Sequence, residues 1–442
     1  MNAAHLLAHG VGGRQDLPIT LTALIIGAVL ALIISFTVLG VLWRRPRLDR
    51  DGTAGRPVPG WLRAWADAPA WRWTVRLVGL ILFGYFGIAV LAGPDTVDNP
   101  AFGALYVLLW VGIAPVSLLL GPVWRALNPL RTLHRLAALA LRRDPAAGLR
   151  PVPARMGLWP AAAGLFAFVW LELVAPGRAT LPVITAWLVV YLLAMFVGAL
   201  VYGSGWFERG DPFEVYSTLV GRLAFLGRRA DGVLVWRNPL DGIAGVTAVP
   251  GLVPFVIVLL GSTMFDSLSN APFWLRFVQE NGLPAPVTGT LGLVAVIAVV
   301  GAAYRGATTL AGRRAGTDAT AVPVRLAHSI VPIAVGYIIA HYYSLLVLEG
   351  QRTVALASDP LGTGSDWLGT RDLEIRSGWI TPTGVALMQI TVIVIGHLLG
   401  TVLAHDRALY LFPRARAVAG QVPLLLLMVV YTVTGLLLLY AG

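Results

Sequence analysis

The chain contains no cysteine and no lysine, and charged residues make up only 12% of its 442 residues. Without cysteine there are no disulfides, thiolate metal sites or thiol nucleophiles, so a bound metal must be held by histidine, carboxylate or other oxygen ligands. The scarcity of charge accompanies a hydrophobic fraction of 57% and a mean hydropathy of +0.76. This balance excludes an ordinary soluble globular domain.

Apolar runs of helix length recur along the whole chain. A helix needs about 20 apolar residues to cross the hydrocarbon core, where it satisfies its own backbone hydrogen bonds. The runs do not alternate as the strands of a membrane barrel do. We therefore predict an all-α membrane protein, a polytopic helical bundle of about ten transmembrane helices. The predicted spans are 18–43, 74–92, 105–120, 158–175, 181–202, 249–265, 291–304, 326–348, 380–404 and 422–440.

Arginine is concentrated in alternate loops, such as 44–63 and 125–155. Because cytoplasmic loops carry the excess of positive charge, these loops are predicted inside and both termini outside. The net charge of +11 therefore reflects topology, and we predict no nucleic-acid partner. The predicted location is a bacterial plasma membrane. The expected partners are the lipid bilayer and a small-molecule substrate or solute, and the sequence leaves the oligomeric state open.

We expect a single integral membrane domain over residues 1–442, without a separate soluble domain. Residues 1–17 form a predicted outer tail. Residues 121–157 and 203–248 form predicted inner loops with interfacial helices. Residues 349–379 form the largest predicted outer loop, the one extracytoplasmic segment long enough to fold into a lid.

Three inner segments begin with Asn or Asp followed by Pro. An N-cap side chain followed by proline at the first helical position predicts a helix start. Glu214, at the third helical position of one segment, completes a capping-box pattern. In another segment, Arg131 and Arg135 share one side of the predicted helix, which indicates an amphipathic helix lying on the inner leaflet. The three dipeptides are Asn128-Pro129, Asp211-Pro212 and Asn238-Pro239.

Ionisable residues inside the predicted spans are the best candidates for a functional site, because a charge at membrane depth is costly. Counting about 1.5 Å per residue from the predicted inner interface places Glu172, Asp266 and His341 at a similar outer depth. His397 lies nearer the middle of the next span. We predict Glu172 and Asp266 as catalytic residues of a site in the outer half of the membrane.

Histidines with carboxylates suit zinc, copper or iron, and a metal with an open position can activate water for hydrolysis of an ester or phosphoester. We predict a divalent transition metal, zinc first among them, with ligands drawn from the spans and from the outer tail. No His-Glu-x-x-His motif supports this site. The candidate ligands are His341, His397, His328, His9 and Asp16.

The same groups fit two other function classes. Titratable residues at staggered depths form a proton relay in proton-coupled secondary transporters of small solutes. A membrane scaffold or assembly factor would require no site at all. The purely structural interpretation of an intramembrane histidine is a hydrogen bond between helices, worth about 0.6 kcal/mol on average. Uptake driven by a proton gradient would favour transport, and turnover without a gradient would favour an enzyme.

Three motifs resemble those of a family of bacterial polytopic membrane proteins, some of whose members are labelled fenitrothion hydrolase. The motifs are His9-Gly10 with Asp16-Leu17-Pro18, the run from His328-Ser329 through His341-Tyr342-Tyr343-Ser344 to Gly350-Gln351, and Ala357-Ser358-Asp359-Pro360. The resemblance implies a helical membrane fold and cleavage of an organophosphate triester. It brings no assigned catalytic residues with it. It adds weight to five positions for testing: His9, Asp16, His328, His341 and Asp359.

Overall fold

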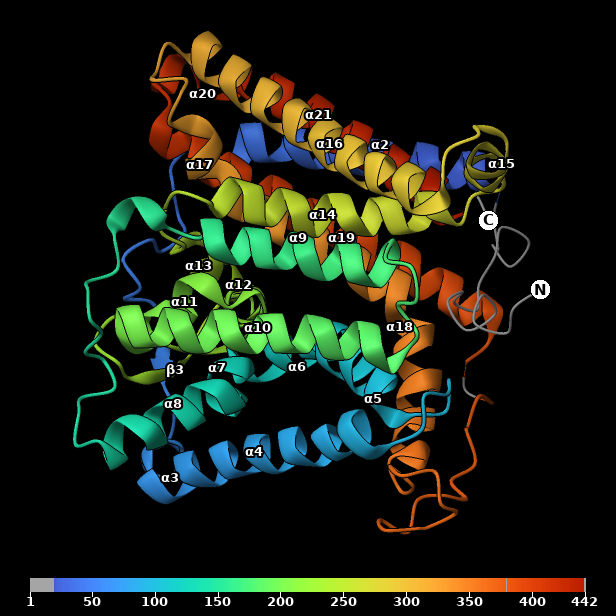
Figure 1. Cartoon of the computed structure of the whole chain (residues 1–442). Helices are drawn as coiled ribbons and strands as arrows, with labels where there is room; N and C mark the ends of the chain where they lie inside the picture. Colours follow the sequence, from blue (N-terminus) through green and yellow to red (C-terminus); the bar gives the residue numbers. More distant parts are fainter. Residues whose placement is uncertain (1–19, 379, 441–442) are drawn as a thin grey trace. The chain divides into compact units, whose positions relative to one another are not determined.

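The computed structural model of the chain describes residues 20–378 and 380–440 (Figure 1). Within this part, nine helices are long and apolar enough to cross a membrane, or ten if one bent pair forms a single span. The predicted all-α polytopic bundle is confirmed. The long helices are α2 (Leu21–Leu42), α4 (Pro69–Ala92), α9 (Trp159–Leu173), α10 (Leu181–Tyr202), α14 (Leu252–Ser269), α16 (Ala285–Ala315), α18 (Val331–Leu356), α19 (Pro382–Leu411) and α21 (Val422–Leu439).

Short helices and one small sheet connect the spans. The sheet is antiparallel in the order β1 (Arg56–Pro57), β3 (Leu234–Trp236), β2 (Leu226–Arg228). The short helices are α3 (Gly60–Asp67), α5 (Pro100–Phe102), α7 (Val123–Leu127), α8 (Pro129–Ala140), η3 (Ala154–Met156), η4 (Gly203–Trp206), α11 (Phe207–Gly210), α12 (Pro212–Gly221), α13 (Pro239–Ala244), α15 (Pro272–Glu280), α17 (Val322–Leu326), η5 (Ala327–Ile330), η6 (Arg414–Arg416) and α20 (Ala417–Gly420).

The third predicted span, 105–120, is a broken helix. Its first part is the π-helix η2 (Gly103–Val111), its second part is α6 (Ile113–Leu120), and the two are bent by 40°. The break falls at Gly112, where an added methyl group would lie 2.4 Å from the Leu108 carbonyl oxygen. A π-helical turn is a recognised cause of a kink. The apolar sequence predicted the span but not its bend.

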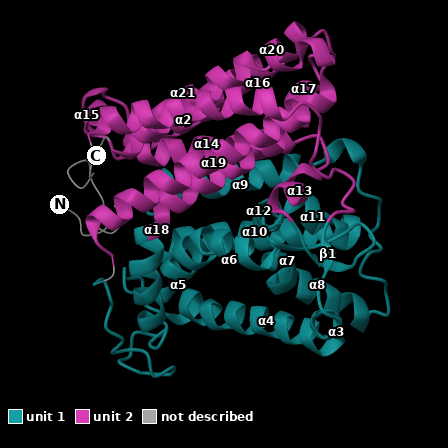
Figure 2. Ribbon diagram, turned by 180° about the vertical axis from the view of Figure 1, so that it is seen from behind, with its two compact units in different colours: residues 1–10, 55–237, 344–379 teal, residues 11–54, 238–343, 380–442 magenta. Residues whose placement is uncertain are grey.

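The described chain divides into two compact units, coloured separately in Figure 2. The first unit comprises residues 55–237 and 344–378, and the second comprises 20–54, 238–343 and 380–440. Helix α18 contributes residues to both units. Each unit contains several of the long apolar helices, and the single membrane domain expected from the sequence stays a prediction.

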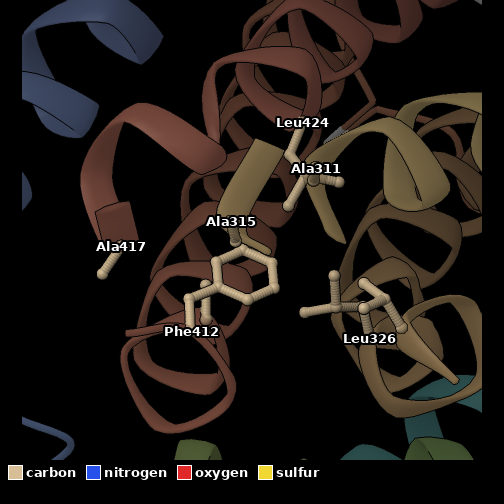
Figure 3. Close-up of a cluster of buried hydrophobic side chains, with 8 residues drawn as sticks. Ala311, Ala315, Leu326, Phe412, Ala417 and Leu424 are labelled. Carbon is tan, nitrogen blue, oxygen red and sulfur yellow. The ribbon is translucent and has the colours of Figure 1, made fainter. Parts of the chain in front are cut away.

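The second unit is held together by apolar contacts between its long helices. Helix α16 packs on α14 and α21, and α2 packs on α19 and α21. One buried cluster in this unit is drawn in Figure 3, where the Phe412 ring points toward Ala315. Small alanines opposite large side chains let the helices approach closely. The cluster consists of Ala311, Ala315, Val322, Leu326, Ala408, Phe412, Ala417 and Leu424.

The three predicted helix starts are confirmed. Asn128, Asp211 and Asn238 each accept hydrogen bonds from backbone amides of the following turn, and proline takes the first helical position. The capping-box prediction was wrong for Glu214. The Glu214 carboxylate does not make the reciprocal bond of a capping box. It accepts two bonds from Arg131 instead, because a buried carboxylate requires a cationic partner.

The predicted boundary of the large outer loop was also wrong. Helix α18 continues to Leu356, so the first residues of the 349–379 segment are helical. Within this extension, Thr353 donates from Oγ1 to the Glu349 carbonyl one turn earlier, at 2.6 Å. The remaining loop turns on Asp359, whose carboxylate accepts the backbone N–H groups of Thr363 and Gly364. Hydropathy did not predict the last two turns of α18, because these turns contain polar residues.

Candidate functional site

The candidate site lies in the second unit, where the last turns of α14 meet α18. Asp266 and Ser267 are consecutive residues of α14. Tyr337 and His341 are four residues apart on α18, and this spacing places them on one face of the helix. Tyr342 follows His341 directly. Two helices thus bring five polar side chains together in otherwise apolar surroundings.

These side chains form a continuous chain of hydrogen bonds. Tyr337 Oη lies 2.7 Å from Ser267 Oγ, and Ser267 Oγ lies 3.2 Å from His341 Nδ1. His341 Nε2 lies 2.8 Å from Asp266 Oδ2, which also accepts the hydroxyl of Tyr342 at 2.7 Å. Each ring nitrogen of His341 therefore has a partner of its own.

The direction of each bond follows from what an ionised carboxylate can do. An ionised Asp266 can only accept, so a neutral His341 beside it donates from Nε2 and its Nδ1 is left as an acceptor. Ser267 then donates to Nδ1 and accepts from the hydroxyl of Tyr337. All protons in the chain point toward Asp266. This is the arrangement in which a proton can be passed from Tyr337 to Asp266 by successive hops.

The surroundings hold the His341 ring in place. The ring stacks on Tyr337 with an interplanar angle of 9° and meets Tyr342 edge-on with 4.6 Å between the ring centroids. The side chains of His341 and Asp266 are 13% and 15% exposed. The pair is therefore mostly buried but keeps a small accessible surface.

The structure brings together two of the predicted site residues, Asp266 and His341. Glu172, predicted at the same depth, lies on α9 in the first unit. Its carboxylate is near Tyr216, where burial first and this charge second raise the pKa of the phenol. The grouping of Glu172 with Asp266 and His341 stays a prediction.

His397 and His328 lie elsewhere in the second unit, and both are buried. His397, on α19, bonds through Nδ1 to the carbonyl of Ile393 at 2.9 Å. His328, on η5, is hydrogen-bonded to the backbone of Arg325. Among residues 20–378 and 380–440, no side chain or backbone group bonds Nε2 of either ring.

Three of the predicted metal ligands, His341, His397 and His328, lie in the described part of the chain. In the part of the chain that the structure describes, no three His, Asp or Glu side chains gather closely enough to share an ion. Both nitrogens of His341 are engaged by protein partners, so its surroundings do not fit a metal ligand. His9 and Asp16 lie outside the described residues. The zinc centre predicted from the sequence is untested and stays a prediction.

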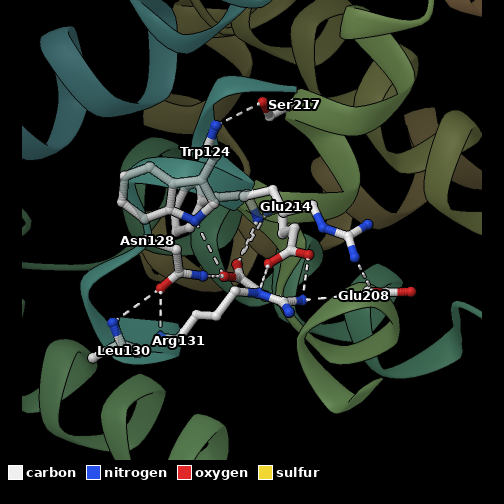
Figure 4. A network of polar contacts seen from close by, with 10 residues as sticks. Trp124, Asn128, Leu130, Arg131, Glu208, Glu214 and Ser217 are labelled. Atoms are coloured by element: carbon white, nitrogen blue, oxygen red, sulfur yellow. Dashed lines mark hydrogen bonds and ion pairs between the residues drawn. The ribbon is translucent and has the colours of Figure 1, made fainter. Parts of the chain in front are cut away.

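A second polar network is buried in the first unit, on α8 and α12 (Figure 4). Arg131 binds Glu214 with two parallel bonds, 3.0 Å from Nε and 2.6 Å from Nη2, and the Glu214 side chain is 1% exposed. The N-cap residues of the two helices also meet, because Asn128 donates to Asp211 at 2.7 Å. The network fastens α8 to α12, a structural function that the sequence did not reveal.

Burial of Glu214 predicts a pH-dependent stability. Burial raises the pKa of Glu214 from 4.5 to about 7, against the opposing charge of Arg131. Between these values the folded state binds more protons than the unfolded state, so the free energy of unfolding falls as the pH rises from about 5 to 7. The fall attributable to Glu214 is at most about 3 kcal/mol. Melting midpoints in detergent should decrease across this range, and Glu214→Gln should remove this part of the slope. An unchanged slope in that variant would contradict the assignment.

The fold and these polar clusters define the class: a polytopic α-helical membrane protein with partly buried networks of ionisable side chains. No family model matches the chain, and searches of curated proteins and of solved structures likewise found no match. The site is therefore interpreted from its own geometry.

Sequence reasoning missed three members of the site: Ser267, Tyr337 and Tyr342. Each carried a signal in the sequence. Ser267 and Tyr342 are direct neighbours of the predicted residues Asp266 and His341, and Tyr337 stands one helical turn before His341. Hydroxyl groups next to buried ionisable residues are natural hydrogen-bond partners, and a search for them would have found all three.

Proposed function

We propose that the protein is a proton-coupled membrane transporter of a small solute, with Asp266 and His341 as its proton-binding site. The observation that carries the proposal is the hydrogen-bond chain from Tyr337 through Ser267 and His341 to Asp266. Asp, Glu and His chains inside a helical bundle are typical of proton relays in pumps and transporters. The location within a predicted span also supports the proposal. An ionisable pair at membrane depth costs stability, and such pairs typically mark functional sites.

The proposed relay conserves protons at every step. Tyr337 passes its hydroxyl proton to Ser267, Ser267 passes one to Nδ1 of His341, and Nε2 of His341 passes one to Asp266. A proton arriving from the Tyr337 side restores the tyrosine hydroxyl, and Asp266 becomes a neutral acid. It releases its proton through the partly exposed end of the site. This end faces outward in the topology predicted from the arginine-rich loops.

Protonation of Asp266 provides the coupling to solute movement. The ionised carboxylate makes charge-assisted bonds with His341 and Tyr342, and these fasten α14 to α18. Neutralisation weakens both bonds, so it shifts the balance between two arrangements of the helices. A solute that prefers one of the two arrangements would be coupled to the proton in this way.

Proteoliposomes test the proposal directly. A potassium gradient with valinomycin would drive protons into vesicles loaded with a pH-sensitive dye, with pooled amino acids, sugars and nucleosides outside. We expect proton uptake at least tenfold above that of protein-free vesicles, together with accumulation of at least one solute. Uptake equal to that of protein-free vesicles would refute proton coupling and favour the scaffold alternative.

A second candidate function rests on the order Ser267–His341–Asp266, which is the order of a hydrolase triad. In that mechanism the Oγ of Ser267 forms a bond to the acyl carbon or phosphorus of an ester. The leaving group departs, and the Oγ proton passes to Nδ1 of His341. This is the type of activity that the resemblance to fenitrothion hydrolases implies. Ser267 is only 5% exposed and is bonded to Tyr337, so its geometry favours the relay.

A fluorophosphonate probe separates the two candidates. Such probes form a covalent bond with an activated serine, so a hydrolase would be labelled at Ser267 and Ser267→Ala would abolish the label. We expect no labelling above that of the Ser267→Ala variant, since the hydroxyl serves the relay. Stoichiometric labelling of Ser267, located by peptide mass spectrometry, would instead establish the hydrolase.

A further inference from the structure

Two buried histidines in the second unit have a ring nitrogen that the relay described above does not use. His397 and His328 are each 2% exposed. Within the described ranges, Nε2 of each ring lacks a hydrogen-bond partner. A buried polar atom without a partner requires an explanation, and a bound water or a transient proton is the simplest one.

The tautomer of His397 follows from its hydrogen bond to the backbone. A backbone carbonyl can only accept, so Nδ1 of His397 donates to Ile393 and Nε2 keeps a bare lone pair. This lone pair can accept a proton while the Nδ1 bond stays intact. Loss of that proton returns the ring to its starting state. His397 is thus built as a reversible proton acceptor at membrane depth.

Contacts between α18 and α19 set the height of His397 relative to the relay. The two segments run antiparallel and approach so closely that a methyl group on Gly396 would lie 2.6 Å from the Pro332 carbonyl oxygen. Gln389 fastens the other end by donating to Ala340 at 3.1 Å. The pairs that define the register are Ala340–Gln389, Pro332–Gly396 and Ser329–Gly400.

In this register the proton-exchanging groups form a series along the helix pair. His397 lies level with Val331 and Pro332, about 8 Å along the axis beyond Tyr337 at 1.5 Å per residue. His328 follows after about 5–7 Å, the range allowing for its 3₁₀ turn. One or two hydrogen-bonded waters span steps of this length.

We infer that His397 and then His328 continue the proton path from Tyr337 toward the other end of the helix pair. This inference rests on the proposed function. A proton taken up at Nε2 of His328 passes through water to Nε2 of His397, and from there to the hydroxyl of Tyr337. Each imidazole binds one proton and releases one, so both rings return to the neutral state. The path would cover roughly 20 Å of the hydrocarbon thickness, counted at 1.5 Å per residue from His341 to His328.

His405 lies near the end of the same series but has no free nitrogen. Its Nδ1 lies 3.0 Å from the amide oxygen of Gln421, and its Nε2 lies 3.0 Å from the carbonyl oxygen of Trp43. Both contacts fasten α19 to neighbouring segments. We assign His405 a structural function, and the path ends at His328.

Asparagine substitutions test the path while preserving the backbone contact. The amide nitrogen of asparagine occupies the place of Nδ1, so His397→Asn and His328→Asn keep a donor but lose the basic nitrogen. His134→Gln, in the first unit, is the matched control. In the vesicle assay we expect each asparagine variant to lose at least tenfold in proton uptake and the control to stay within twofold of wild type. Melting midpoints establish that all the variants are folded.

A kinetic measurement excludes a merely structural effect. Infrared spectroscopy on proteoliposomes follows the carboxyl band of protonated Asp266 after a pH jump in the compartment on the His328 side, so that protons reach Asp266 along the proposed path. In His397→Asn the final amplitude should match wild type, while the rate of appearance should fall at least tenfold. Wild-type uptake and rate in both asparagine variants would overturn the path and leave the Asp266 site standing. Absence of uptake in the wild type would instead refute the proposed function itself.

Discussion

Asp266→Asn is expected to lower proton uptake in the vesicle assay at least tenfold, and to the level of protein-free vesicles if the relay is the sole route. Asparagine has nearly the shape of aspartate and can still accept hydrogen bonds from His341 and Tyr342. The asparagine amide cannot bind and release a proton, so the last proton transfer of the relay, from His341, has no acceptor. The loss should be far larger in uptake than in stability, because asparagine keeps the shape of the side chain and both hydrogen bonds, although these bonds are weaker without the charge.

Glu280→Gln is the matched control for this experiment. Glu280 is an exposed carboxylate on α15, close in sequence to Asp266 but outside the hydrogen-bond chain. The same change of acid to amide there should leave uptake within twofold of wild type. Asp266→Glu restores a titratable group and should recover part of the uptake. Full activity in Asp266→Asn would exclude Asp266 as the proton-binding residue.

Depth counting predicted two of the five side chains of the candidate site and could not predict the other three. The count along each helix gives the height of a residue, and it placed Asp266 and His341 at the same level. It gives neither the rotation of a helix nor its lateral neighbours. Glu172 shares the predicted height but belongs to the first unit, whereas Ser267 belongs to the site because α14 turns that face toward α18.

The fold shows the same division between local and tertiary information. The Asn-Pro and Asp-Pro pairs predicted helix starts correctly, because a cap depends only on the residues of the following turn. The sequence predicted that Arg131 lies on the charged side of an amphipathic helix, and it did not predict that Arg131 binds Glu214. Glu214 lies 83 residues further along the chain, and no local sequence pattern predicts a contact between residues so far apart.

Arg131→Ala is expected to lower the free energy of unfolding by about 3–5 kcal/mol at pH 8, the typical cost of removing one partner of a buried ion pair. At that pH Glu214 is mostly ionised in the folded protein, since its pKa is about 7. Without the guanidinium it must either stay charged in an apolar site or take up a proton. Denaturant unfolding in detergent micelles measures the loss, which should shrink at pH 6, where protonation costs less.

Arg125→Ala is a matched control with the same substitution and the same 2.6 Å ion-pair distance, here to Glu208. Arg125 and Glu208 are both about half exposed, so we expect a loss of unfolding free energy below about 1 kcal/mol.

The double variant Arg131→Met with Glu214→Leu should recover most of the stability lost in Arg131→Ala, because it leaves neither partner of this ion pair unpaired. An equal loss for Arg125→Ala and Arg131→Ala would contradict this account, since only the Arg131 pair is buried and bidentate. Recovery in the double variant would show that an apolar pair of similar volume can replace the ion pair without loss of stability.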